Sequence, residues 1–423
     1  MKKAVVLGFL LLAVLAGRAG AATAPRVLVI HFGTDLEIDP VTQGWIDGQL
    51  HRAENGGYSA AVIELDTPGG DLDSMRTIVQ TELNLKVPVI VYVPDGSRAA
   101  SAGVWVSEAA DVLAMSPVGT NIGASTPIES TGGNITGSDL RRKVINDAVA
   151  SLRSLMQSHD RNVAWAAKAV RVASSLSAQE ALRMNIIDLT SPSLTALLNT
   201  INGRVTVPRH LTLHTANAEL VNTSPGFVTK FLDVLINPNV ASLLFLAGII
   251  GIGFEIFHPG VILPGTVGAI AMVGALFGLS VLTVSWTGLA LIIVGIALLV
   301  IDAHVATHGV LTVGGLISLA VGLSTLFNSA PGGAHVSTPL IVTLTALLGG
   351  FWAIAITKAV AARRRPVLVG PQEIVGMEGV VRENGLVFVR GELWRVASQE
   401  PLAEGQHVKV DALDGLTLRV HRV

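Results

Sequence analysis

The sequence predicts a multi-domain chain with an α/β domain, then an α-helical transmembrane domain, then a small all-β barrel. Half of the 423 residues are hydrophobic and only 14% are charged, whereas a soluble chain usually has nearer a quarter of charged residues. From Asn239 the chain is apolar for most of about 120 residues, enough for several membrane-spanning helices. Short strand-like segments precede this region and return after Arg365, each bounded by turn residues.

The N-terminus has the three-part pattern of a secretory signal peptide, predicted over residues 1–21. Lys2-Lys3 precedes an apolar run from Ala4 to Ala16, and Ala19-Gly20-Ala21 provides small residues at the cleavage position. The alternative is an uncleaved anchor, which is disfavoured because the run is short for a hydrocarbon core about 30 Å thick. We therefore expect the following domain to be exported.

Residues 26–215 are predicted to form the α/β domain, and two of its strand ends carry the candidate chemistry. One buried strand ends in Pro68-Gly69-Gly70, a turn where missing Cβ atoms let backbone N–H groups face a substrate. The next strand leads to Ser101, which stands among small residues at the start of a helix. The pattern predicts Ser101 as a nucleophile, with Gly69 or Gly70 together with Ala102 as oxyanion-hole donors. The alternative is a pair of ordinary turns between strands and helices.

Two motifs in this domain resemble those of membrane-bound serine peptidases with a Clp/crotonase-like fold, which signal peptide peptidase A shares. They are Asp66-Thr67-Pro68-Gly69-Gly70-Asp71 and Ala100-Ser101-Ala102-Gly103. The similarity runs from about Arg26 to Asp188. With its signal sequence, membrane domain and C-terminal barrel in this order, the whole chain resembles a long-form NfeD protein.

The resemblance implies a Ser-Lys dyad, in which a desolvated lysine takes the proton of the serine. No histidine lies between Ser101 and His159, so the His-Asp pair of soluble Clp proteases has no obvious counterpart. Lys143-Val144-Ile145-Asn146 matches the NfeD pattern around the dyad lysine, and Lys143 is the expected general base. Two alternatives stay open: Lys143 is a surface lysine at a helix start, or Lys168 supplies the base. The adjacent pair His159-Asp160 is disfavoured, because neighbours in a chain rarely face one another.

Residues 238–362 are predicted to form the transmembrane domain, with about five spans. Lys358 and the arginines at 363–365 follow the last span, which places that end in the cytoplasm by the positive-inside rule. An odd number of spans then puts the protease domain outside the cytoplasm and the C-terminal domain inside. If Pro259–Gly265 forms a re-entrant hairpin, four spans remain. The expected spans are Val240–Phe257, Val261–Val284, Leu289–Ala303, Val310–Phe327 and Leu340–Ala362.

The sequence predicts no metal and no cofactor. Glu255 and Asp302 each end a span before a Gly-rich turn, and the favoured interpretation is a pair of interfacial caps, with a polar site in the membrane as the alternative. His258, His304 and His308 match no known zinc spacing, and the chain contains no cysteine.

Residues 366–423 are predicted to form an OB-like barrel of about five short strands. Gly391–Val396 and Asp414-Gly415-Leu416 resemble the signature of the NfeD C-terminal domain. The barrel lacks a basic face with interleaved aromatic residues, so we expect a protein partner and no nucleic acid. Trp394 is expected in the barrel core, with an exposed anchor for a partner as the alternative.

The predicted function is a membrane-anchored serine endopeptidase. The resemblance implies apolar peptide substrates, a homo-oligomer of dimer size or larger, and a stomatin-like membrane protein as partner. One alternative is a catalytically idle scaffold that organises stomatin-type membrane assemblies. The other is an acyl-CoA enzyme of crotonase type, which is disfavoured by export and by the lack of a carboxylate at the nucleophile position.

Overall fold

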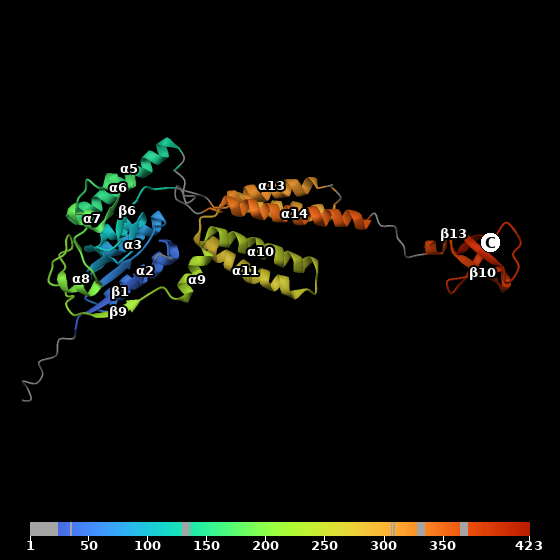
Figure 1. The fold of residues 1–423 in the computed structure, drawn as a ribbon, viewed down its shortest axis with the longest axis horizontal. Coiled ribbons are helices and arrows are strands. Elements are labelled where there is room, and N and C mark those ends of the chain that lie inside the picture. The colour runs from blue at the N-terminus through green and yellow to red at the C-terminus, as the bar shows by residue number, and fades with distance from the viewer. Residues whose placement is uncertain are drawn as a thin grey trace, which may run out of the picture. The chain divides into compact units, whose positions relative to one another are not determined.

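A computed structural model describes residues 24–33, 36–128, 135, 137–305, 307, 309–327, 335–363 and 371–423. The predicted signal peptide, part of the polar stretch that precedes Lys143, His308 and the arginines at 364 and 365 lie outside the described residues. The described chain forms an α/β domain, a series of apolar helices and a closed five-stranded barrel (Figure 1). The predicted fold class is therefore confirmed.

The α/β domain is built on a six-stranded sheet in the order β8-β5-β3-β2-β1-β9, and every neighbouring pair is parallel. The central strands are nearly continuous apolar runs that are buried on both faces, as expected for a parallel sheet covered by helices. β9 lies after residue 215 and pairs with β1, so the sheet extends to Thr223. The strands are β1 Arg26–Phe32, β2 Ala60–Leu65, β3 Val89–Val93, β5 Val112–Met115, β8 Leu189–Thr190 and β9 Glu219–Thr223.

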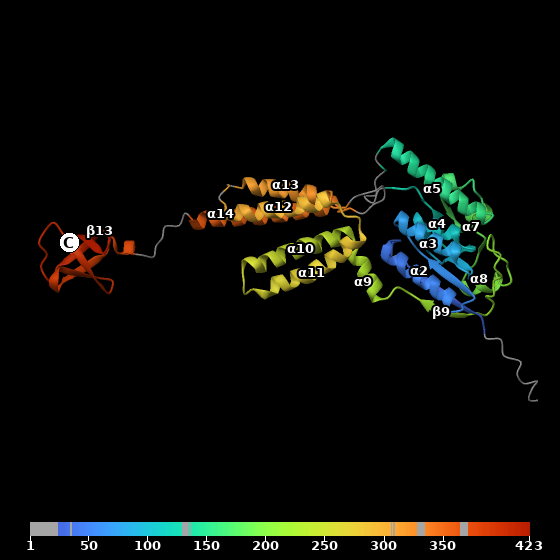
Figure 2. The same ribbon diagram turned by 180° about the vertical axis from the view of Figure 1, so that it is seen from behind.

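Helices cover both faces of this sheet (Figure 2). The larger apolar core includes Phe32, Ile46, Ile78 and Trp165, all almost fully buried. The smaller core on the other face is closed by Leu197 and its neighbours in α8. The helices are α2 Pro40–Asn55, α3 Leu72–Asn84, α4 Ala102–Ala109, α5 Ser138–Ser158, α6 Ala166–Arg171, α7 Ala178–Arg183 and α8 Leu194–Thr200.

A second, three-stranded sheet stands beside the first and positions the candidate nucleophile. It consists of β4 (Arg98–Ala100), β6 (Asn121–Gly123) and β7 (Ser175–Ser177), with β6 in the centre. β4 runs parallel to β6, and β6 runs antiparallel to β7. The chain therefore makes a short strand before Ser101 and enters α4 directly after it.

Apolar helices occupy each region where a span is expected. α10 and α11 have 20 residues each, a length of about 30 Å that matches the hydrocarbon core. No re-entrant hairpin interrupts either of these two described helices. The apolar stretches of the remaining three are shorter, and the number of crossings stays a prediction. The helices are α10 Pro238–Phe257, α11 Ile262–Val281, α12 Trp286–His304, α13 Val310–Ser324 and α14 Thr338–Arg363.

Glycines allow these helices to pack closely in pairs. A Cβ at Gly251 would lie 2.9 Å from the Cα of Gly268, so α10 and α11 meet almost backbone to backbone. A Cβ at Gly295 would lie 2.8 Å from the carbonyl oxygen of Gly315, which brings α12 and α13 equally close. Small residues at such contacts are typical of helices that associate in membranes.

The C-terminal domain is a closed barrel in the order β10-β11-β12-β14-β13, closed by antiparallel pairing of β10 with β13. Val387, Val408 and Leu418 are fully buried in its core. Trp394 packs against this core while its neighbour Leu393 is exposed, which confirms the expected facing of Trp394. The strands are β10 Glu378–Arg382, β11 Leu386–Val389, β12 Glu392–Ala397, β13 His407–Asp414 and β14 Thr417–Arg422.

Candidate active site

Ser101 occupies a sharp turn between β4 and α4. Its backbone has φ 52° and ψ −120°, a conformation that residues with a side chain rarely adopt and that is concentrated at functional sites. The Ser101 N–H donates to the carbonyl of Gly123 at 3.0 Å, and its own carbonyl accepts from the Val104 N–H at 3.0 Å. Within the described residues its Oγ makes no hydrogen bond. The turn therefore holds a half-buried hydroxyl with no internal partner.

The glycine turn that follows β2 lies directly against this serine. Gly69 has φ 122°, and a Cβ at this position would come within 2.8 Å of the Ser101 Oγ and 3.2 Å of the Ala102 nitrogen. Backbone bonds fix the two segments together, because the Thr67 N–H donates to Arg98 O and the Ala100 N–H to Thr67 O. The structure thus brings together the two predicted motifs, and Gly69 is required because any side chain would displace the serine.

The backbone donors beside Ser101 are not equivalent. The Gly69 N–H donates to the Oγ1 of Thr67 at 3.1 Å, so it is already occupied. The N–H groups of Gly70 and Ala102 make no hydrogen bond within the part of the chain that is described, and Ala102 is the first residue of α4. These two amides are the ones left to bind an oxyanion.

The base candidates are not brought to Ser101. Lys143 is exposed in the first half of α5, where residues 137–143 are all exposed. Further along α5, Asp147 pairs with Arg76 of α3, and Asn146 accepts from Arg171 at 3.0 Å. No contact between Lys143 and Ser101 occurs among the described residues. The role of Lys143 therefore stays a prediction.

The alternatives to Lys143 form no hydrogen bond with the serine in the described part of the chain either. Lys168 is exposed on α6. His159 is buried at the end of α5, where its Nδ1 lies 2.9 Å from the carbonyl of Leu155. Burial lowers the pKa of His159, and the nearby Arg161 adds to this shift. These contacts are those of a structural histidine rather than a catalytic one.

A buried ion cluster binds the C-terminal end of α4, and the sequence analysis did not predict it. Arg161 pairs with Glu108 at 3.2 Å and with Asp188 at 2.9 Å, and it also donates to the carbonyls of Glu108 and Ala110. A cation bound to the last carbonyls of a helix satisfies groups that have no partner within the helix. Burial raises the pKa of Glu108 to about 7 despite this pairing. For Asp188, burial acts to raise the pKa, but Arg161, the Leu113 N–H and Arg204 together outweigh it, so the pKa is lowered.

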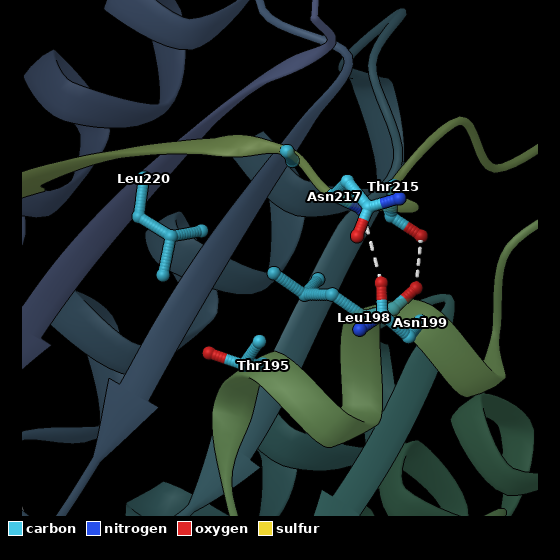
Figure 3. Close-up of a pocket in the computed structure, with 7 residues that line it drawn as sticks. Thr195, Leu198, Asn199, Thr215, Asn217 and Leu220 are labelled. Carbon is cyan, nitrogen blue, oxygen red and sulfur yellow. Dashed lines mark hydrogen bonds between the residues drawn. The ribbon is translucent and has the colours of Figure 1, made fainter.

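The described residues of the domain form a small pocket and no metal-binding cluster. No group of three or more His, Asp or Glu side chains suited to a metal ion occurs in the described ranges. A pocket of about 40 Å³ lies at α8 (Figure 3). None of the residues discussed at Ser101 lines it, and hydrogen bonds such as the one from Thr215 Oγ1 to Leu198 O, 2.6 Å long, close its wall. The pocket is lined by Thr195, Leu198, Asn199, Thr215, Asn217, Ala218 and Leu220.

Three family models match the chain in succession. The NfeD1b N-terminal domain matches residues 27–205, the NfeD integral membrane domain residues 239–358, and the NfeD-like C-terminal, partner-binding domain residues 371–422. The chain is 34% identical over 406 residues to Membrane-bound protease PH1510 of Pyrococcus horikoshii, covering 91% of each chain. It is 22% identical over 455 residues to Membrane protein NfeD1b of Bacillus subtilis, covering 100% of this chain and 98% of that one.

Solved structures of a protein described as the 1510-N membrane-bound stomatin-specific protease are also similar. A serine-to-alanine mutant is 34% identical, with a TM-score of 0.45, over 48% of this chain and 100% of that chain. A lysine-to-alanine mutant in complex with a substrate peptide is 33% identical, with a TM-score of 0.46, over 50% and 97%. Three successive domain matches, and 34% identity over 91% of the length to a named membrane-bound protease, show that the chain belongs to the NfeD family of membrane proteins, in its long form.

Proposed function

We propose that this chain is a membrane-anchored serine endopeptidase with Ser101 as nucleophile and Lys143 as general base. The observation that carries the proposal is the contact between the two predicted motifs. The Ser101 Oγ stands in a strained turn beside Gly69, next to the unoccupied N–H groups of Gly70 and Ala102. A hydroxyl nucleophile and amide donors for the oxyanion are the groups that acyl transfer requires.

The proposed reaction has two steps. The Ser101 Oγ attacks the peptide carbonyl while the amine of Lys143 takes the hydroxyl proton, and the N–H groups of Gly70 and Ala102 bind the oxyanion. The protonated amine then gives its proton to the leaving nitrogen, which leaves an acyl-serine. Water, deprotonated by the same amine, hydrolyses the ester and returns the serine.

This reaction requires Lys143 to approach Ser101. The fully buried residues of α5 begin at Ala148, and before it only Ile145 is partly buried against the core, so a shift of the start of the helix would disturb few core contacts. Desolvation by a bound peptide or a second protomer would make an amine a usable base near neutral pH. We therefore propose that substrate binding or assembly of two or more protomers brings the dyad together.

The proposed substrates are apolar peptide segments of a stomatin-like membrane partner. Support comes from the relative that is 34% identical and carries the name of a membrane-bound protease, and from related structures described as stomatin-specific. The match of residues 371–422 to a partner-binding domain supports the barrel as the docking site for this partner. We further propose that the protease domain lies outside the cytoplasm and the barrel inside it.

A second candidate is a catalytically idle scaffold that organises stomatin-type membrane assemblies. Lys143 is exposed and forms no hydrogen bond with Ser101 among the described residues, which favours this alternative. The partner-binding match of the barrel is compatible with both functions.

Peptide cleavage by the purified full-length chain separates the two candidates. The wild type should cleave a fluorogenic apolar peptide, and Ser101→Ala or Lys143→Ala should each reduce kcat by at least about a thousandfold, with little further loss in the double variant because dyad members act as a unit. Lys168→Ala is the matched control and should retain wild-type activity. Activity that survives in Lys143→Ala but not in Lys168→Ala would move the base to Lys168. No cleavage by the wild type would favour the scaffold.

A further inference from the structure

The short helix α9 (Phe227–Leu235) exposes large apolar side chains, which is unusual for a helix on a water-soluble surface. Phe227, Phe231 and Val234 follow the spacing i, i+4, i+7 and share one face of the helix. They are 82%, 50% and 52% exposed, and the two phenylalanine rings stack with centroids 6.0 Å apart. The outer face of α9 is therefore a compact apolar patch.

Two of the three polar residues of α9 point toward the protein, whereas Lys230 is exposed. Thr229 and Asp233 lie on the side away from the phenylalanines and are only partly exposed. The side chain of Asp233 is hydrogen-bonded to that of Asp39, the residue that caps the start of α2. An amphipathic surface helix usually turns its apolar side inward, whereas α9 buries Leu235 and also carries a second apolar face outward.

The position of α9 in the chain indicates what covers its outer face. Only Ile236 and Asn237 separate it from α10, the first helix of the integral membrane domain. Asn237 has an extended backbone and caps α10 by accepting from the Asn239 N–H at 3.0 Å, so a new helix starts in a new direction. Figures 1 and 2 both show α9 set at an angle to α10. A helix that adjoins the start of a membrane helix and lies across it is placed at the lipid surface.

We propose that the outer face of α9, formed by Phe227, Phe231 and Val234, inserts into the interfacial region of the lipid bilayer beside the start of α10. The partly buried carboxyl contact between Asp233 and Asp39 would then connect the membrane surface with α2 of the protease domain. Ile38 precedes Asp39 and forms two backbone hydrogen bonds with the residues that flank Gly70. Its N–H donates to Gly69 O, and its carbonyl accepts from the Asp71 N–H. The lipid-facing helix α9 is thus connected to the oxyanion turn through Asp39 and the adjacent Ile38.

The absence of cysteine from the chain allows a direct test. Phe231→Cys and, separately, Phe227→Cys in the full-length protein are labelled with a nitroxide and reconstituted into vesicles of phosphatidylcholine and phosphatidylglycerol. Collision with oxygen, which concentrates in lipid, is compared with collision with a water-soluble nickel chelate. Val273→Cys, on the exposed side of α11, is the lipid control. Asn55→Cys, exposed at the end of α2, is the water control.

Labels at positions 227 and 231 should favour oxygen over nickel, as the label at position 273 does. Ratios equal to that at position 55 would overturn the proposal, because the face would then be in water. Low accessibility to both reagents would also overturn it, because the face would then be covered by a second copy of the chain, the one protein in the vesicles. Each labelled variant is first required to elute as the wild type does in size-exclusion chromatography.

Discussion

The nucleophile side of the candidate site and its base side are held by the fold in different ways. Ser101 is fixed between β6 and Thr67 by backbone hydrogen bonds, against a glycine that leaves no room for movement. Lys143 lies in an exposed helical turn, whereas α5 contacts the core at the partly buried Ile145 and has its fully buried residues from Ala148 onward. If Ser101 and Lys143 form the proposed dyad, the fold holds the serine in its reactive geometry, and Lys143 must move to the serine before it can accept the proton. Such a division would keep a membrane protease idle until a substrate or a second protomer arrives.

The largest expected effect comes from breaking the support behind Ser101. Arg161→Met would leave Glu108 and Asp188 buried without their shared cation, and it should lower the free energy of unfolding by about 3–5 kcal/mol. Scanning calorimetry of the full-length protein should show the lowest transition shifted down. Arg204→Met is the control, because Arg204 pairs with the same Asp188 but is 43% exposed, and its loss should stay below about 1 kcal/mol. Equal shifts for the two variants would contradict a special role for the buried pair.

The second prediction tests the glycine that faces the serine. Gly69→Ala would place a methyl group against the Ser101 side chain, and kcat should fall about 100- to 1000-fold because nucleophile and amide donors are displaced together. Gly57→Ala is a matched control, since Gly57 also has a positive φ, of 66°, but open space around its Cβ position. It should carry a backbone penalty for a positive φ, smaller than that at Gly69, with unchanged kcat. An active Gly69→Ala variant would show that the turn does not need to remain this close to Ser101.

The third prediction concerns α3, which follows the oxyanion turn and carries the arginine bound to α5. Both carboxylate oxygens of Glu82 are buried without a hydrogen bond, and burial, with the nearby Asp111, raises its pKa well above 4.5. Above pH 4.5 the folded chain keeps a proton that the unfolded chain loses, so stability should fall as pH rises. Glu82→Gln removes this titration. The melting temperature of the variant should exceed that of the wild type increasingly from pH 5 to pH 8, and parallel curves would contradict the assignment.

The smallest expected effect tests delivery of the base. Arg76→Ala removes the exposed ion pair between α3 and Asp147 of α5, and easier movement of α5 should raise kcat by about 1.4- to fivefold, the range of a surface pair worth about 0.2–1 kcal/mol. Wild-type activity should rise similarly with moderate salt, while the variant should respond little. Arg142→Ala is the control, because Arg142 pairs with Asp139 inside α5. A lower kcat in Arg76→Ala would mean that the ion pair holds the productive position.

Much of this molecule is determined by local sequence pattern. Alternating apolar runs and turn residues placed the strands of the barrel, and long apolar stretches placed α10 to α14 to within a few residues. Pro68-Gly69-Gly70 and Ser101 were also recognisable, because a positive φ or a close approach restricts the residues allowed at a position. These features depend on residues that are near one another in the chain.

Only the tertiary structure decided which groups at the site are available. The Gly69 N–H is taken by Thr67, Arg161 reaches α4 from about fifty residues away, β9 completes the sheet after residue 215, and Lys143 remains apart from Ser101. Each of these depends on contacts between distant segments, and composition and spacing carry no record of them. The outward position of the apolar face of α9 also depends on tertiary contacts. The sequence of α9 predicts this face but not whether it contacts the protein.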